Sequence, residues 1–228
     1  MSIKSKLAKP FAKQVKKSVY KWANNPHKTQ EKVFRNLIKN GRYTLFGKDH
    51  KFEKITNIKS FQSNIPIRDY EGIRSYINKI FLGRQNILWP GKPFYFAKSS
   101  GTTSGVKYIP ITKDAIHQQI RAAREALLNY IYHTTNIDIV NGKHIFIQGS
   151  PLLDDKNGFA LGRLSGIVAH HVPSYLQKNR LPTWDTNCIE DWESKVNAIV
   201  DETYDKDMTI IGGIPSWVQM YFEKLVSK

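Results

Sequence analysis

SSGTTSGVKYIP, at residues 99–110, decides how the rest of the chain is interpreted. The apolar, aromatic run before it, residues 93–97, predicts a short buried strand, and residues 108–111 predict a second one. A loop between two strands that combines hydroxyl side chains, glycines and a lysine offers backbone N–H groups, hydroxyl donors and one positive charge. Since these groups bind the oxygens of a polyphosphate, we expect the rest of the chain to be the scaffold that presents this loop. The simpler alternative is an ordinary polar turn.

Two other functions of such a loop fail on residue spacing. A Walker A loop needs four residues between its first glycine and a Gly-Lys pair, with a helix after the lysine. Here only three residues separate Gly101 from Gly105, Val106 precedes the lysine, and strand-like residues follow it. A serine-hydrolase elbow needs the serine midway between two glycines, and neither 101–105 nor 162–166 has it there. The sequence therefore indicates neither a P-loop NTPase nor an α/β-hydrolase.

The composition of the 228-residue chain is that of a globular protein, with 40% hydrophobic and 24% charged residues. A single cysteine, Cys188, excludes an internal disulfide and favours a reducing compartment. No apolar run is long enough to span a bilayer, and the N-terminus lacks the apolar core of a secretory signal. We therefore expect a cytoplasmic protein.

The net charge of +16 is concentrated near the N-terminus. Residues 1–60 carry sixteen Lys and Arg against three acidic residues, a balance of +13. We predict a basic amphipathic arm at residues 1–28, whose apolar stripe has helical spacing and consists of Leu7, Phe11, Val15, Val19 and Trp22. The favoured interpretation is a surface helix that packs this stripe on the body of the protein and leaves its lysines in water. Contact with an anionic membrane or with nucleic acid is the less favoured alternative.

Helices and strands are predicted in alternation after the arm. The predicted helices cover residues 29–39, 69–81, 112–133, 191–204 and 216 onward, and the predicted strands cover 143–147 and 208–211, with a glycine-rich loop at 157–166. This alternation favours an α/β fold with a mixed sheet and packed helices. In the long helix, Arg124 lies four residues from Ile120 and from Leu128. We expect it on the buried side, where its charge requires either a protein carboxylate or a substrate carboxylate.

The sequence gives no sign of a metal site. His170 and His171 are adjacent, and no cysteine or acidic residue follows at ligand spacing, so we interpret them as structural or loop histidines. The pair Asp154-Asp155 is interpreted as part of a turn. No catalytic residue is assigned from these patterns.

The loop and two further segments resemble a known family. SSGTTSGVK with its lysine resembles the first signature of the acyl-adenylating superfamily, and the continuation YIP resembles the auxin-responsive acyl-acid amido synthetase family in particular. Ala97-Lys98 is similar to bacterial-type members, as are GRLSGIVAHH at 162–171 and GIPSWV at 213–218. The resemblance extends from about Arg35 onward.

This resemblance implies an ATP-dependent ligase. ATP, accompanied by Mg²⁺, adenylates a carboxylic acid, and an amino-acid amine then attacks the acyl-adenylate to form an amide. The residues that it assigns to ATP and its phosphates are Ser99, Ser100, Gly101, Thr102, Thr103, Ser104, Gly105 and Lys107. In the family an arginine of the next helix meets the substrate carboxylate, which makes Arg124 the candidate here. The implied partners are a small carboxylic acid and an amino acid, with no stable nucleic-acid partner.

The chain departs from the family's pattern in three respects. Many relatives have one more residue between the second glycine and the lysine, and relatives are substantially longer. The later signatures, with an acidic residue near the adenylate and an aspartate for the ribose, are absent, as is the mobile C-terminal domain. We therefore interpret residues 29–228 as an incomplete N-terminal adenylation domain that is inactive alone. A ligase that passes the acyl group to coenzyme A or a protein thiol is one alternative, and a basic nucleic-acid- or membrane-binding module is another.

Overall fold

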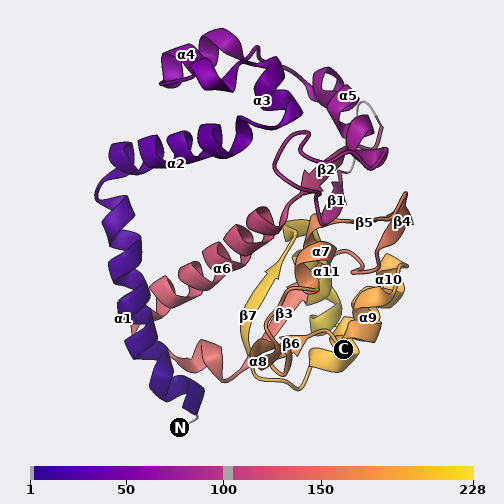
Figure 1. The fold of residues 1–228 in the computed structure, drawn as a ribbon. Coiled ribbons are helices and arrows are strands. Elements are labelled where there is room, and N and C mark those ends of the chain that lie inside the picture. The colour runs from indigo at the N-terminus through magenta and orange to yellow at the C-terminus, as the bar shows by residue number, and fades with distance from the viewer. Residues whose placement is uncertain (1–2, 100–104) are drawn as a thin grey trace. The chain divides into compact units, whose positions relative to one another are not determined.

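The computed structural model describes residues 3–99 and 105–228, and Figure 1 shows their helices and strands. The chain divides into two compact units. The first contains Met1–Ser18, Ile116–Leu153 and Gly162–Lys228, and the second contains Val19–Ala115 and Asp154–Leu161. The structure is of the predicted α/β class, and its strands form two separate sheets. No helix in the described part of the chain has the length and apolarity needed to cross a membrane.

The second unit combines short helices with a four-stranded sheet of order β2-β1-β5-β4. Its helices are α2 (Pro26–Gly41), α3 (Leu45–Asp49), η1 (Phe52–Lys54), α4 (Ile58–Asn64) and α5 (Tyr70–Phe81), and its strands are β1 (Tyr95–Lys98), β2 (Tyr108–Ile111), β4 (Asp154–Lys156) and β5 (Phe159–Gly162). Strands β1 and β2 are antiparallel, with Lys98 opposite Tyr108. The helix predicted at 69–81 is confirmed, because the Asp69 side chain accepts a hydrogen bond from the Gly72 N–H at 2.9 Å as its N-cap.

The prediction of a loop at 157–166 is wrong. Strands β4 and β5 form an antiparallel hairpin, in which Asp155 lies opposite Ala160, and a short helix α7 (Leu164–Ala169) follows. Asn157 and Gly158 make the turn, with positive φ angles of 55° and 72°. Asn-Gly is the pair that such a tight hairpin turn prefers. Asp154-Asp155 accordingly lies in a strand and not in a turn.

Aromatic side chains fill the core of the second unit. Phe96 is fully buried on β1, and its ring stacks on that of Phe81 from α5 at a centroid distance of 4.3 Å. Phe159 of β5 meets Phe96 edge-on at 5.3 Å. Because rings from one helix and two strands interlock, the sheet that carries the 99–107 loop is tied to α5.

The first unit contains a parallel sheet of order β6-β3-β7. Its strands are β3 (Lys143–Ile147), β6 (Arg180–Leu181) and β7 (Met208–Gly213), and its helices are η2 (Asp138–Val140), α7, α8 (Ser174–Gln177), α9 (Trp184–Cys188), α10 (Trp192–Thr203) and α11 (Pro215–Val226), with α6 (Lys113–Thr134) entering it from residue 116. Ile145 and Ile147 of β3 pack with Ile199 of α10 and Tyr221 of α11. The predicted helices and strands at 112–133, 143–147, 191–204 and 208–211 are confirmed.

Helix α1 (Ile3–Ala23) is present, and of the predicted stripe it buries only Val15. Among the described side chains of the helix, those that are buried are Ser5, Ala8, Ala12 and Val15. Ser5 donates a hydrogen bond to the Asn141 side chain at 2.9 Å. Small residues on one face let a helix approach its neighbours closely, so the larger side chains Leu7, Phe11 and Trp22 are left exposed. The division into an arm (1–28) and an adenylation domain (29–228) stays a prediction.

Candidate functional site

The two ends of the 99–107 loop are joined at its base. The Ser99 N–H donates to the Lys107 carbonyl at 3.0 Å, and the Lys107 N–H donates to Ser99 Oγ at 3.3 Å. The first of these bonds continues the β1–β2 ladder by one step, and the second is accepted by the serine side chain. Gly105 has a positive φ of 78°, with open space where a Cβ would lie, so the chain turns there in a conformation that glycine favours. Of the predicted phosphate-binding residues, Ser100, Gly101, Thr102, Thr103 and Ser104 lie outside the described residues.

The strands beneath the loop are held by polar contacts within the second unit. The ammonium group of Lys98, the last residue of β1, pairs with the Asp154 carboxylate on β4. The Tyr70 hydroxyl accepts a hydrogen bond from the Tyr108 N–H at 2.9 Å. Lys156 places its ammonium 4.7 Å from the centre of the Tyr108 ring. The two strands that carry the loop are therefore held in place by an ion pair, a hydrogen bond and a cation–π contact.

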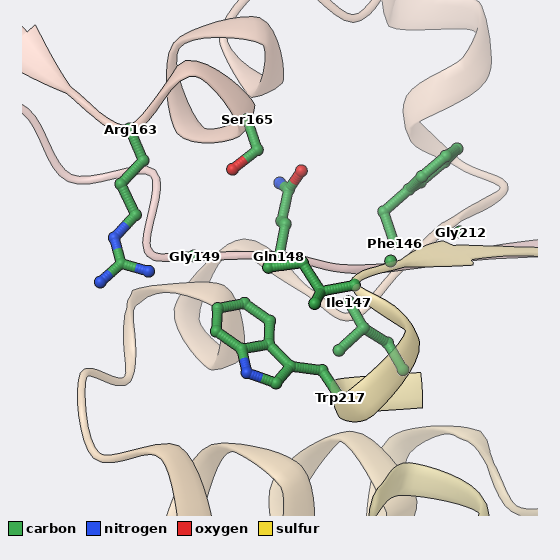
Figure 2. A pocket seen from close by; sticks show the side chains of 10 residues that line it. Phe146, Ile147, Gln148, Gly149, Arg163, Ser165, Gly212 and Trp217 are labelled. Atoms are coloured by element: carbon green, nitrogen blue, oxygen red, sulfur yellow. The ribbon is translucent and has the colours of Figure 1, made fainter. Parts of the chain in front are cut away.

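A pocket lies in the first unit at the carboxyl ends of β3 and β7, and Figure 2 shows it from close by. Its volume is about 370 Å³, which is within the range of small-molecule sites. It is lined by Phe146, Ile147, Gln148, Gly149, Arg163, Ser165, Gly212, Gly213, Ile214 and Trp217. The carboxyl edge of a parallel sheet is where α/β proteins place their ligands.

Apolar side chains form the walls of the pocket, and few polar groups reach it. The indole of Trp217, at the start of α11, stacks on Trp192 of α10 at 4.2 Å, which fixes the orientation of this wall. Gln148 extends from the end of β3 toward the side of the pocket where Ser165 lies (Figure 2). Its Nε2 is buried and has no hydrogen-bond partner among the described residues. A buried amide donor without an acceptor is unfavourable, so this group is suited to an acceptor on a ligand.

Three glycines let the segments around the pocket lie close together. A Cβ on Gly149 would lie 2.6 Å from Cδ of Arg163, so the arginine stem crosses directly over this backbone. A Cβ on Gly213 would lie 2.8 Å from the Ile147 carbonyl oxygen, and one on Gly166 would lie 2.6 Å from that of Ser150. Larger residues would push α7 and β7 away from β3. The sequence analysis did not identify this pocket, although glycines near the ends of two predicted strands were a visible signal.

Arg124 does not lie on a buried side of α6. Its side chain is exposed, and its guanidinium carbon is 5.9 Å from the centre of the Phe11 ring of α1. The inward orientation predicted from spacing is wrong because the middle of α6 has little cover: Ile120 is only partly buried and Ala123 is exposed. The assignment of Arg124 to the substrate carboxylate is untested by this geometry and stays a prediction.

The adjacent histidines make protein contacts. Nε2 of His170 is hydrogen-bonded to the Pro151 carbonyl at 2.8 Å, and its ring meets Trp184 edge-on. Burial, and then the charges of His170 and His117, hold the pKa of His171 below its usual value. Residues 3–99 and 105–228 contain no group of three or more His, Cys, Asp or Glu side chains that could hold a metal ion.

A buried lysine was also missed by the sequence analysis. Lys195 of α10 is 2% exposed, and its Nζ donates to the Asn187 carbonyl at 2.5 Å. Burial lowers the pKa of this ammonium group. The spacing in α10 was a visible signal, because Lys195 lies four residues before the buried Ile199 and therefore on the same face of the helix.

The chain is similar to proteins of one family. A family model described as "GH3 family N-terminal domain" matches residues 15–198. The Arabidopsis thaliana protein "Indole-3-acetic acid-amido synthetase GH3.15" is 41% identical over 64 residues, which cover 27% of this chain and 11% of that protein. "Indole-3-acetic acid-amido synthetase GH3.4" of the same plant is 26% identical over 123 residues, or 51% of this chain and 21% of that protein.

Solved structures show the same fold. "GH3.15 acyl acid amido synthetase" superposes with a TM-score of 0.75 at 18% identity, covering 92% of this chain and 38% of that chain. "AtGH3.15 acyl acid amido synthetase in complex with 2,4-DB" superposes with a TM-score of 0.59 at 20% identity, covering 95% of this chain and 37% of that one. The chain therefore spans well under half the length of these similar proteins.

Proposed function

Because the chain belongs to the GH3 family, we propose that it is the ATP-binding N-terminal part of a ligase that joins a carboxylic acid to an amino acid. The observation that carries the proposal is the family match over residues 15–198, which includes the 99–107 loop. The similar Arabidopsis proteins are named as amido synthetases of indole-3-acetic acid, and one solved relative is bound to 2,4-DB. A small carboxylic acid is accordingly the proposed substrate class here.

The proposed reaction has two steps. A carboxylate oxygen attacks the α-phosphorus of ATP, and pyrophosphate leaves. An amine then attacks the acyl carbon, AMP leaves with the bonding electron pair, and the nitrogen loses a proton to give the amide. The hydroxyls, N–H groups and lysine of the loop are the donors that stabilise charge on the phosphates as pyrophosphate departs. The hydrogen bonds between Ser99 and Lys107 support this role, since they place both residues at the loop base. Mg²⁺ would accompany the nucleotide, and we assign no residue to it.

We propose that the pocket between β3 and β7 binds the carboxylic acid. Trp217, Phe146 and Ile214 offer apolar contacts to its hydrocarbon part. Gln148, with its buried and unpartnered Nε2, offers a hydrogen bond to an acceptor oxygen. Arg163 adds a positive charge beside Gly149. Arg124 remains the competing candidate for the carboxylate. The single cysteine supports a cytoplasmic location.

An exchange assay tests the proposal. In the enzyme that contains this chain, labelled pyrophosphate should be incorporated into ATP only when an acid substrate is present, and addition of an amino acid should yield an amide detectable by mass spectrometry. Formation of a thioester with coenzyme A in place of the amide would instead support the alternative ligase, which passes the acyl group to a thiol. We expect no exchange by residues 1–228 alone. Exchange by residues 1–228 alone would contradict the interpretation of this chain as an incomplete adenylation domain. The ligase assignment would stand.

A further inference from the structure

Helix α1 exposes an apolar stripe that its own packing does not use. Leu7 is 62% exposed, Phe11 42% and Trp22 49%. At about 100° per residue these three side chains fall within about 60° of the helix circumference. The face that α1 packs on the first unit is the neighbouring one, made of small residues. The sequence alone favours burial of the whole predicted stripe, and the structure buries only Val15 of it. Trp22 belongs to the second unit, so we confine the α1 stripe to Leu7 and Phe11 of the first unit.

The remaining surface of α1 is strongly basic. Its exposed lysines are Lys6, Lys9, Lys13, Lys17 and Lys21. The helix contains no acidic residue, and the first one in the chain is Glu31. The exposed guanidinium of Arg124 lies beside Phe11, which brings a further positive charge to the stripe. A helix with exposed Leu and Phe side chains and a separate lysine-rich face is suited to the boundary between lipid headgroups and acyl chains.

We propose that α1 docks the protein on an anionic phospholipid surface, with the α1 stripe inserted at the headgroup level. Charge complementarity selects this occupant. A second copy of the chain would bring another basic helix against this one, and the two would repel each other. A nucleic acid would use the lysines but would leave Leu7 and Phe11 in water. Lys17 lies about 80° from Leu7 by the same helical spacing, and its side chain extends toward the headgroup phosphates while its stem covers apolar surface. The interaction is independent of the proposed ligase activity.

Because α1 is anchored to the first unit, a helix that binds the membrane brings that unit with it. Lys16, which is only partly exposed, donates a hydrogen bond to the Tyr132 hydroxyl of α6 at 2.7 Å. Ser5 is bonded to Asn141, next to η2. Ala12 is completely buried. These contacts hold the helix while Leu7 and Phe11, on the neighbouring face, stay exposed, so binding requires no unfolding of α1 from the first unit.

Co-sedimentation with vesicles tests the proposal on the 228-residue chain. The chain should bind vesicles of phosphatidylcholine with about one-third phosphatidylglycerol and should not bind pure phosphatidylcholine. The variant Leu7→Ser/Phe11→Ser should weaken binding about tenfold or more through lost apolar insertion. The variant Lys13→Gln/Lys17→Gln should weaken it about tenfold or more through lost attraction.

Matched variants test whether vesicle binding depends on α1 itself or on any exposed apolar side chain and any exposed lysine. Val226→Ser removes an 87%-exposed side chain from α11, and Lys113→Gln/Lys178→Gln removes two exposed lysines outside α1. Both should bind like the unaltered chain, with all variants showing unchanged far-UV circular dichroism. The proposal is overturned if anionic vesicles are not bound, or if Leu7→Ser/Phe11→Ser binds them normally. The proposal is also overturned if the unaltered chain forms a dimer that Leu7→Ser/Phe11→Ser loses, or if the chain binds duplex DNA as tightly as it binds anionic vesicles.

Discussion

The 99–107 loop and the β3–β7 pocket are built in opposite ways. The loop closes two antiparallel strands that are neighbours in the chain, and backbone hydrogen bonds join its ends. The pocket collects side chains from three segments far apart in the sequence, 146–149, 163–165 and 212–217, which close glycine contacts hold together. A local loop is set by its own residues, whereas a pocket of this kind depends on the packing of the unit. Substitutions should therefore affect the two in different ways.

The largest effect is expected at Lys107. Replacing it with alanine should slow ATP–pyrophosphate exchange by the full enzyme about 100-fold for every acid tested. The reason is the loss of a lysine charge that would stabilise the negative charge on the departing pyrophosphate. The Michaelis constants for different acids should change little. Lys113→Ala, an exposed lysine a few residues further on, serves as the control and should keep normal exchange. Full activity of Lys107→Ala would remove the loop from the proposed mechanism.

A more selective effect is expected at Gln148. Gln148→Leu should raise the Michaelis constant for the acid about tenfold, with a smaller change in kcat, since it removes one hydrogen-bond donor from the pocket. The effect should differ between acids, depending on whether they carry an acceptor at that position. Gln118→Leu, on the exposed side of α6, is the matched control. A uniform loss of kcat without any change in the Michaelis constant would argue that Gln148 does not contact the acid.

The same contrast explains how much the sequence could predict. The helix at 70–81 and the strands at 143–147 and 208–211 follow from caps and periodicity, which are local. The pocket could not be derived because Gln148, Arg163 and Trp217 come together only through tertiary packing. The buried face of α1 was predicted correctly only at Val15 for a similar reason: periodicity favours large apolar residues, and close packing selected Ala8 and Ala12 as well.

A smaller effect is expected at the hairpin that supports the loop. In Gly158→Ala the new Cβ meets open space, so only the positive φ of 72° opposes it. The free energy of unfolding should fall by about 1 kcal/mol in denaturant titrations. Gly83→Ala, at φ 82° and also in open space, should lose a similar amount without touching the sheet. A reduced exchange rate in Gly158→Ala alone would show that the β4–β5 hairpin positions the loop.

The smallest effect is expected at Lys195 and depends on pH. Burial lowers the pKa of its ammonium group, so between that pKa and the usual lysine value near 10.4 the unfolded chain holds more protons than the folded one. This lysine therefore contributes stability above the usual lysine value, and the contribution is lost as the pH falls toward the folded pKa. Lys195→Met removes this dependence and also the hydrogen bond to the Asn187 carbonyl, a loss of about 1 kcal/mol. Relative to the unaltered chain, the variant should gain stability as the pH is lowered from 10 to 7 in urea titrations. The exposed Lys178→Met should show no such trend. If the difference in unfolding free energy between Lys195→Met and the unaltered chain does not depend on pH, burial does not shift the titration of Lys195. The lysine then joins α9 to α10 only as a hydrogen-bond donor.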